Sequence, residues 1–280
     1  MTRCKPLLSA LALYLAMLTA SACAANARVA AAADLKFAFD ELKPLFEKTM
    51  PQHSLELILG SSGKLHQQID HGAPFDLFFS ADVSLPKALV NSGKAVAPVT
   101  LYGLGRVVLW STKFDASKLT LQQLPETQFR KLAIAAPEHA PYGARAKEAL
   151  QHAGVWDKVQ ARLVFGENIA HTAQLIDTQA AELGIVALSL AMNDKLKSKG
   201  GFYLIPASYH QALEQAFVIT QRGASNTAAQ DFATFMRSET ARQVMRRYGF
   251  VLPGEAAHHH PAAGRAACRA ADPPPSSIAA

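Results

Sequence analysis

The chain has 280 residues, of which half are hydrophobic and 18% are charged, and its formal net charge is +6. This length suffices for one large domain or two modest ones, and the ordinary composition is typical of a chain that folds over most of its length. The three cysteines, Cys4, Cys23 and Cys268, lie near the two ends, so the folded body should hold neither a disulfide framework nor a cysteine-ligated metal site. Because the basic residues are scattered, we expect no nucleic-acid partner.

The first 27 residues have the pattern of a secretory signal peptide. The basic segment Met1–Lys5 precedes an almost wholly apolar run at Leu7–Leu18, and Ala25-Asn26-Ala27 is a small-x-small cleavage site. The apolar run is too short to span a membrane comfortably. We therefore expect cleavage near Ala27 and export. Lipidation at Cys23 is the alternative, ranked second because the leucine usual three positions before such a cysteine is missing.

Strand and helix patterns alternate after the signal. Val29–Ala33 predicts a short strand, and Asp34 is a good N-cap for a helix whose apolar residues, from Leu35 to Phe46, follow helical spacing. The series continues with a strand at Leu55–Leu59, a turn at Gly60–Gly63, a helix at Lys64–Ile69, a strand at Phe75–Ser80 and a helix at Leu85–Ser92 that Gly93 closes. This alternation indicates a parallel α/β sheet.

A second α/β series follows a strand predicted at Leu104–Ser111, which we expect to cross between two lobes. Its strands are predicted at Leu132–Ala136, Leu163–Phe165, Leu183–Leu188, Phe202–Ile205 and Ala216–Thr220, and its helices at Ala144–His152 and Ile169–Thr178. Gln221–Ser225 resembles a linker, and two helices at Asn226–Ser238 and Thr240–Tyr248 close the fold. The predicted organisation is a signal at 1–27, one lobe at 28–106 plus 221–253, a second at 107–220, and a disordered tail at 254–280.

Four strand-to-helix turns, two from each lobe, recur along the chain. In open α/β sheets, ligands bind beyond the carboxyl ends of the strands, where such turns lie. The turn Gly60-Ser61-Ser62-Gly63 places two hydroxyls at a helix N-terminus, which is a favourable seat for an anion. Alone, this turn indicates no more than a helix cap; a ligand held between two lobes would touch all four turns.

Five blocks of the sequence resemble the periplasmic molybdate-binding proteins of ABC importers. They are Gly60–Gly63, the segment GAPFDLFFSAD at Gly72–Asp82, Ala140–Gly143, Leu183–Ala187 and Arg247–Phe250. The resemblance runs from about Val29 to Pro253. It implies an α/β, two-lobed type II periplasmic-binding-protein fold, each lobe a mixed, mostly parallel sheet flanked by helices. It also implies a periplasmic protein that captures molybdate or tungstate between the lobes and delivers it to a membrane permease. We expect a monomer without a cofactor.

The resemblance also implies a set of oxyanion contacts and no direct metal-ion ligands. By position, these contacts fall on Ala33, Asp34, Ser62, Tyr142 and Ile169. At Tyr142 and Ile169 the backbone N–H is the main donor. The chain departs from the family pattern where Ala33 and Ala187 replace hydroxyl-bearing residues of some members, and where Asp34 replaces Ser or Asn. Because a carboxylate facing a dianion would be repelled, we expect Asp34 to turn its side chain away or to cap its own helix, and to offer only its N–H.

Other functions stay open at this point. The same fold could bind sulfate, phosphate or a small organic acid. A serine hydrolase with Ser61 or Ser62 as nucleophile would need His66 and a carboxylate, Asp76 or Asp82, within reach. Since Gly-Ser-Ser-Gly lacks the Gly-x-Ser-x-Gly spacing of a nucleophile elbow, we expect a binding protein and not an enzyme.

Overall fold

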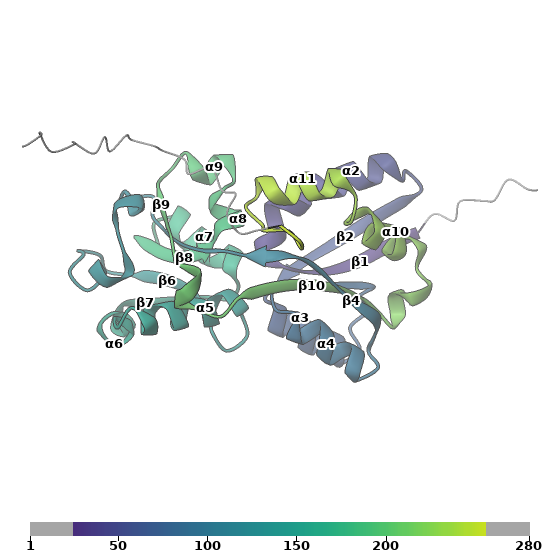
Figure 1. The fold of residues 1–280 in the computed structure, drawn as a ribbon, viewed down its shortest axis with the longest axis horizontal. Helices are drawn as coiled ribbons and strands as arrows, with labels where there is room; N and C mark the ends of the chain where they lie inside the picture. The colour runs from purple at the N-terminus through teal and green to yellow at the C-terminus, as the bar shows by residue number, and fades with distance from the viewer. Residues whose placement is uncertain (1–24, 256–280) are drawn as a thin grey trace, which may run out of the picture.

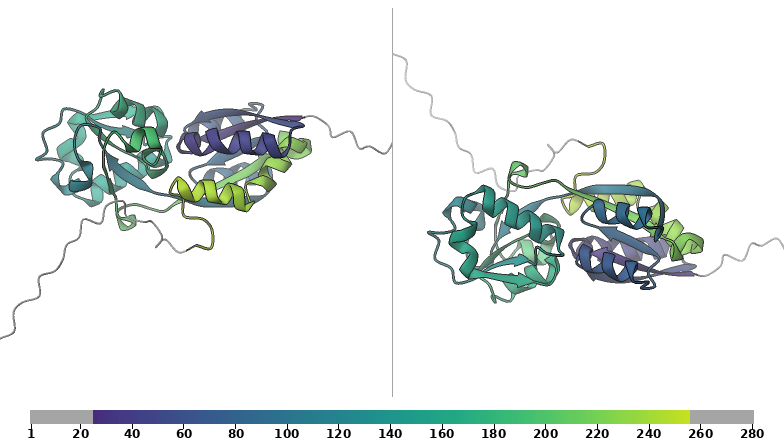
Figure 2. Two further views of the ribbon diagram at one scale, coloured as in Figure 1. Left: turned by 90° about the horizontal axis from the view of Figure 1, so that it is seen from above. Right: turned by 90° about the horizontal axis from the view of Figure 1, so that it is seen from below.

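The computed structural model of the protein describes residues 25–255, and in it the chain forms two lobes that lie side by side (Figures 1 and 2). Each lobe is built on a five-stranded mixed sheet, with strand orders β2-β1-β3-β10-β4 and β7-β6-β8-β5-β9. The predicted fold class, two mixed α/β sheets flanked by helices, is confirmed. The signal segment up to residue 24, Cys23 and the tail from 256 onward lie outside the described residues.

The first lobe places its sheet between two layers of helices. Its strands are β1 (Ala25–Ala32), β2 (His53–Gly60), β3 (Leu77–Ser80), β4 (Ala95–Gly105) and β10 (Leu213–Thr220). β1 runs parallel to β2 and β3, and β10 runs antiparallel to β3 and β4. The helices α2 (Lys36–Thr49), α10 (Thr227–Phe235) and α11 (Glu239–Arg247) pack on one face, and α3 (Ser62–Asp70) and α4 (Ser84–Asn91) on the other. Because both faces are covered, β3 is apolar along nearly its whole length.

Aromatic side chains fill the first core. Phe39 of α2 meets Phe79 of β3 edge to face, with ring centroids 5.1 Å apart, and Phe46 meets Phe232 of α10 at 5.2 Å. All four rings are fully buried. Such edge-to-face pairs add to the stabilisation from apolar burial and fix α2 and α10 against the sheet.

The second lobe repeats the arrangement with shorter elements. Its strands are β5 (Val107–Trp110), β6 (Leu132–Ala135), β7 (Leu163–Gly166), β8 (Leu183–Ala187) and β9 (Phe202–Leu204). β6 runs parallel to β7 and β8, and β5 runs antiparallel to β8 and β9. Its helices are α5 (Pro141–His152), α6 (Trp156–Val159), α7 (Ile169–Asp177), α8 (Leu188–Ala191) and α9 (Asp194–Lys197).

The predicted strand at Leu104–Ser111 is wrong as a single element. β4 ends at Gly105 and β5 begins at Val107, and the two belong to different sheets, so the chain changes lobes at Arg106. β4 also starts earlier, at Ala95, in a stretch that contains Pro98. Proline argues against a central strand but is tolerated at a sheet edge, which is where β4 lies.

The ends of the described chain differ slightly from the predicted limits of the body. β1 begins at Ala25 and pairs with His53, and Ala27 is fully buried, so the segment predicted as signal overlaps β1 by its last residues. At the other end, Glu255 forms ion pairs with Arg242 and Arg246 of α11. The strand predicted at Ala216–Thr220 is part of β10 and lies in the first sheet between β3 and β4, so its predicted place in the second lobe is wrong. The other lobe boundaries stay a prediction. Among residues 25–255, no helix has the length and apolar character needed to cross a membrane.

Candidate functional site

A small cavity lies between the lobes where four strand-to-helix turns meet. β1 leads through the 3₁₀ turn η1 (Ala33–Leu35) into α2, β2 leads into α3, the turn after β6 leads into α5, and the turn after β7 leads into α7. The cavity is lined by Ala32, Ala33, Asp34, Gly60, Ser61, Ser62, Ala81, Ala140, Pro141, Tyr142 and Ile169. The structure therefore brings together all five residues singled out from the sequence, from both lobes.

A larger groove of about 410 Å³ opens beside this cavity and shares Ala33 with it. Its walls are mostly apolar and include Phe37, Leu59 and Leu190. Neither Ser62, Tyr142 nor Ile169 lines it, so the smaller cavity, with its helix N-termini, is the better candidate for a polar ligand.

Ser62 is held so that its hydroxyl hydrogen is available to a ligand. It is the first residue of α3, it is 1% exposed, and its Oγ accepts a hydrogen bond of 3.0 Å from the backbone N–H of Ala81. An oxygen that accepts this bond keeps its own hydrogen free to donate. The neighbouring Ser61 Oγ is also buried and has no hydrogen-bond partner among the described residues.

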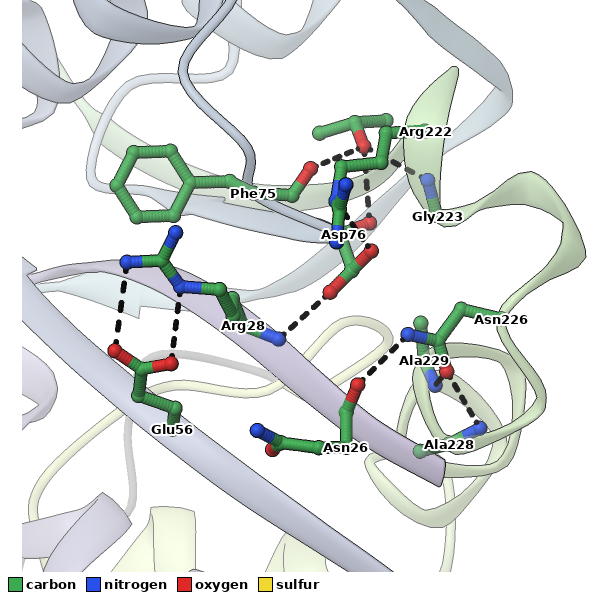
Figure 3. A network of polar contacts seen from close by, with 11 residues as sticks. Asn26, Arg28, Glu56, Phe75, Asp76, Arg222, Gly223, Asn226, Ala228 and Ala229 are labelled. Carbon is green, nitrogen blue, oxygen red and sulfur yellow. Dashed lines mark hydrogen bonds and ion pairs between the residues drawn. The ribbon is translucent and has the colours of Figure 1, made fainter. Parts of the chain in front are cut away.

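The segment GAPFDLFFSAD fixes the position of Ala81 and hence of Ser62. Ser80 Oγ donates to the carbonyl of Asp82 at 2.7 Å and accepts from its N–H at 3.1 Å, which closes the turn around Ala81. At the start of β3, the buried Asp76 accepts from the N–H of Arg28 at 2.8 Å and pairs with Arg222 at 3.2 Å (Figure 3). This network fastens β3 to β1 and to the turn after β10. It thereby fixes the position of Ala81, which directly follows β3.

The second lobe contributes backbone donors. Pro141, which has no N–H, is the first residue of α5, so Tyr142 supplies the first N–H of that helix. In α7 the N-cap Asn168 accepts from the N–H of His171 at 2.9 Å and leaves that of Ile169 uncapped. Among residues 25–255, neither Tyr142 nor Ile169 donates its N–H to a protein acceptor. Unpaired N–H groups at helix starts favour an anion.

The two lobes touch directly at the rim of the cavity. The N–H of Gly63 donates to the carbonyl of His139 at 2.9 Å, and Lys64 pairs with Glu167 at 2.8 Å. A Cβ on Gly63 would lie 2.6 Å from the carbonyl oxygen of His139, so this approach requires glycine. The structure is thus one in which the lobes are closed on each other.

Asp34 does not cap its helix, and that expectation is wrong. It lies inside η1, whose N-cap is Ala32, and its side chain makes no capping hydrogen bond. Its Oδ2 instead accepts from Tyr142 Oη at 3.0 Å and from Gln215 Nε2 at 2.9 Å. The reason is that the N-cap of η1 is Ala32, two residues before Asp34, and the N-cap of α2 is Leu35, one residue after it, so Asp34 occupies neither cap position and its side chain reaches Tyr142 of the other lobe.

Burial controls the ionisation of this group. Desolvation raises the pKa of Asp34 from 3.8 to about 6, against the opposing effect of the hydrogen bonds from Gln215 and Tyr142. Burial, and then the charge of Asp34, raise the pKa of Tyr142 well above its usual value. Tyr142 therefore keeps its hydrogen and acts as the donor.

Sequence reasoning missed two residues that contact Asp34. Gln215 of β10 is fully buried, and Ser189 of α8 donates its hydroxyl to the carbonyl of Asp34 at 2.8 Å. Gln215 carried a usable signal, because it alternates with Leu213 and Phe217 on the apolar face of a strand. A polar side chain on such a face needs a buried partner.

Among residues 25–255, neither serine of the turn has the hydrogen-bond partners of a hydrolase nucleophile. The partner of Ser62 Oγ is a backbone N–H, and no His or carboxylate of the described residues hydrogen-bonds to either serine. Asp76 is committed to Arg28 and Arg222. No group of three His, Cys, Asp or Glu residues within 25–255 is arranged to hold a metal ion.

Comparison with known proteins agrees with this geometry. A family model for bacterial extracellular solute-binding proteins matches residues 27–251. The molybdate-binding protein ModA of Azotobacter vinelandii is 34% identical over 242 residues, which cover 86% of this chain and 96% of that protein. ModA of Rhodobacter capsulatus is 35% identical over 248 residues, with 86% and 95% covered.

Solved structures extend the likeness to the fold. The periplasmic molybdate-binding protein of Azotobacter vinelandii superposes with a TM-score of 0.76 at 32% identity, covering 81% of this chain and 99% of that one. The sulfate-binding protein SubI of Mycobacterium tuberculosis, at 15% identity and a TM-score of 0.64 over 83% of this chain and 88% of that one, shares the fold alone. The resemblance inferred from the motifs is confirmed: this chain belongs to the bacterial extracellular solute-binding proteins and, among them, to the ModA molybdate-binding family.

Proposed function

We propose that this protein captures molybdate or tungstate between its two lobes in the periplasm and delivers the ion to the membrane permease of an ABC importer. One observation carries the proposal. Ala33, Asp34, Ser62, Tyr142 and Ile169 line a single cavity at the meeting point of four helix starts, and no Lys or Arg side chain is among its lining residues. Export through the signal segment and release of the mature protein belong to the same proposal.

The donors around this cavity suit a dianion. The charge of a buried anion must be met by hydrogen bonds or dipoles, and four helix N-termini supply both. Each charge-assisted hydrogen bond contributes about 1.5–3 kcal/mol. Ser62 adds a hydroxyl, and the N–H groups of Tyr142 and Ile169 add donors from the opposite lobe. The ion would thus hold the two lobes together.

The direct test is a thermal-shift and calorimetric panel on the purified protein with molybdate, tungstate, sulfate and phosphate. Molybdate or tungstate at about 1,000 times the dissociation constant should stabilise the protein by about 4 kcal/mol. Sulfate and phosphate, being smaller, should leave some donors of a rigid cage unfilled and bind more weakly. No shift with molybdate or tungstate, together with a clear shift with sulfate or phosphate, would replace the proposal by that of another oxyanion carrier.

The family to which the chain belongs comprises binding components of transport, and we propose that this chain likewise performs no catalysis. Assay of the same preparation with a chromogenic ester tests this. Turnover that is lost in both Ser61→Ala and Ser62→Ala would establish a hydrolase instead.

A further inference from the structure

Three buried polar side chains from different elements meet beside the cavity. Asp34 Oδ2 accepts from Tyr142 Oη at 3.0 Å and from Gln215 Nε2 at 2.9 Å, and Gln215 Nε2 also lies 2.9 Å from Tyr142 Oη. All three residues are at most 2% exposed. Asp34 belongs to the first lobe and Tyr142 to the second, so this cluster is complete only when the lobes are closed.

The end of β4 makes room for the cluster. A Cβ at Gly105 would collide with Tyr142 Oη and Gln215 Nε2. Gly105 immediately precedes the residue at which the chain passes into the second lobe, and it pairs with Leu213 of β10. The cluster is therefore seated against the segment that must bend if the lobes separate.

The negative charge of Asp34 is not balanced inside the closed structure. Both of its side-chain hydrogen-bond donors are neutral, and its Oδ1 has no partner among the described residues. The titratable groups on which the charge of Asp34 acts are the phenols of Tyr102 in β4 and Tyr142 in α5. No Lys, Arg, His, Asp or Glu side chain of the described residues, whether on α2, α5, α7 or β10, forms a hydrogen bond or an ion pair with Asp34. Lys36 pairs with Asp40 at the surface, at 3.2 Å, and Asp177 pairs with Lys199.

Because no neighbouring charge pairs with Asp34, burial is the dominant influence on the pKa of its carboxyl. Desolvation raises its pKa to about 6, and burial also raises the pKa of Tyr102 and of Tyr142, so both phenols stay protonated. If the lobes opened, water would reach Asp34 and Tyr142 would move away. The pKa of the carboxyl would then return toward its ordinary value of 3.8.

We propose that Asp34 couples anion capture to proton uptake: the lobes close on the oxyanion with the Asp34 carboxyl in its protonated form. This inference rests on the proposed function. The balance is that of an acid–base step, in which a buffer acid gives one proton to the Asp34 carboxylate and no bond of the oxyanion breaks. A dianion and a carboxylate that line the same desolvated cavity repel each other, and the proton removes that repulsion. Protonation also turns Asp34 into a hydrogen-bond donor.

The linkage has a definite sign. In the open, ligand-free protein Asp34 is ionised above its ordinary pKa of 3.8, whereas burial and the negative charge of the ion keep it protonated to higher pH in the closed complex. Affinity should therefore fall as pH rises above 3.8, by up to tenfold per pH unit, until Asp34 ionises in the complex as well. Below this pKa the carboxyl is already protonated in the ligand-free protein, and the coupling fades.

Calorimetric titration with molybdate at pH 7.5, repeated in buffers of different ionisation enthalpy, counts the protons taken up. The expected count is close to one proton per ion for the wild-type protein. In Asp34→Asn the amide cannot take a proton, so the count should be close to zero and the affinity nearly constant from pH 6.5 to 8.5. Asp40→Asn is the matched control, because it removes an exposed carboxyl six residues away and should keep the wild-type count.

The outcomes separate the two proposals. Absence of any binding heat with molybdate and with tungstate would refute the proposed function. Binding with the same heat in all buffers would leave that function standing and would overturn the proton coupling. The number of protons taken up per ion is measured on the wild-type protein alone. The proton coupling is therefore tested even if Asp34→Asn fails to fold.

Discussion

Replacement of Ser62 by alanine tests the site most directly. The Ser62 hydroxyl accepts from the N–H of Ala81 at 3.0 Å and has one hydrogen left for the anion. Ser62→Ala should remove one charge-assisted hydrogen bond to the ion and leave the backbone donors of the cavity in place. The expected loss is about 1.5–3 kcal/mol of binding free energy, or roughly 10- to 150-fold in dissociation constant for molybdate.

The same substitution has a second, separable effect on folding. It leaves the buried N–H of Ala81 without its acceptor, which should lower the free energy of unfolding by about 1–3 kcal/mol. Ser61→Ala is the matched control, since its Oγ is buried without a partner among the described residues and its removal costs no protein hydrogen bond. It should change stability little and cost less affinity than Ser62→Ala. Calorimetric titration and denaturant unfolding measure both quantities.

One result would refute this reasoning. Suppose that Ser62→Ala binds molybdate with the affinity of the wild-type protein, while its free energy of unfolding falls because the N–H of Ala81 has lost its acceptor. The hydroxyl would then only support the turn. The anion would then have to be held without Ser62 Oγ, and the assignment of the hydroxyl as a ligand would fall.

Further predictions concern Asp34, closure and the mature end of the chain. Because the pKa of Asp34 is raised from 3.8 to about 6 in the closed form, the free energy of unfolding of that form should fall as pH rises between these values, and Asp34→Asn should recover about 3 kcal/mol at pH 8 in urea unfolding with molybdate bound; an unchanged pH profile would contradict this. Gly63→Ala should hinder the contact with His139, so X-ray scattering should show a larger radius of gyration than for the wild-type protein with molybdate bound. Scattering should also show compaction of the wild-type protein on adding molybdate, as expected for hinge closure. Since Ala27 is fully buried and pairs with Leu55 of β2, mass spectrometry of the exported protein should find a mature N-terminus at or before Ala27.

Local patterns were sufficient to predict most of the fold. Apolar runs such as Phe75–Ser80 became buried strands, and Gly93, Gly154 and Gly249 end helices with φ of 71°, 68° and 81°, which glycine adopts at little cost. The break at Arg106 could not be predicted in this way, because an apolar run looks the same whether it stays in one sheet or passes into another. The edge strand from Ala95 was hidden by its proline and by the lack of an apolar–polar alternation, since its exposed residues include Val96 and Leu101.

In the candidate site, too, the local features could be predicted from the sequence and the long-range contacts could not. The turn at Ser62 and the helix starts at Tyr142 and Ile169 were predictable, since a strand followed by glycine or proline and then a helix fixes the local geometry. The partners of Asp34 were not, because they come from β10 and α5, which are 181 and 108 residues away. Helix-capping preference is a local rule, and here a buried long-range hydrogen bond overrides it.

The position of β10 determines the order in which the two sheets can be completed. β10 lies between β3 and β4 in the first sheet, although it follows the whole of the second sheet in the chain. β5 to β9 form from the continuous segment 107–204, whereas β4 must wait for a partner such as Glu214, which pairs with Leu104. Contacts of such separation close slowly, because the intervening chain loses conformational freedom before they form. The N-terminal half of the polypeptide should therefore finish folding after the segment that is made later, and pulse-labelling hydrogen exchange should find amides of β4 protected after those of β6 and β8.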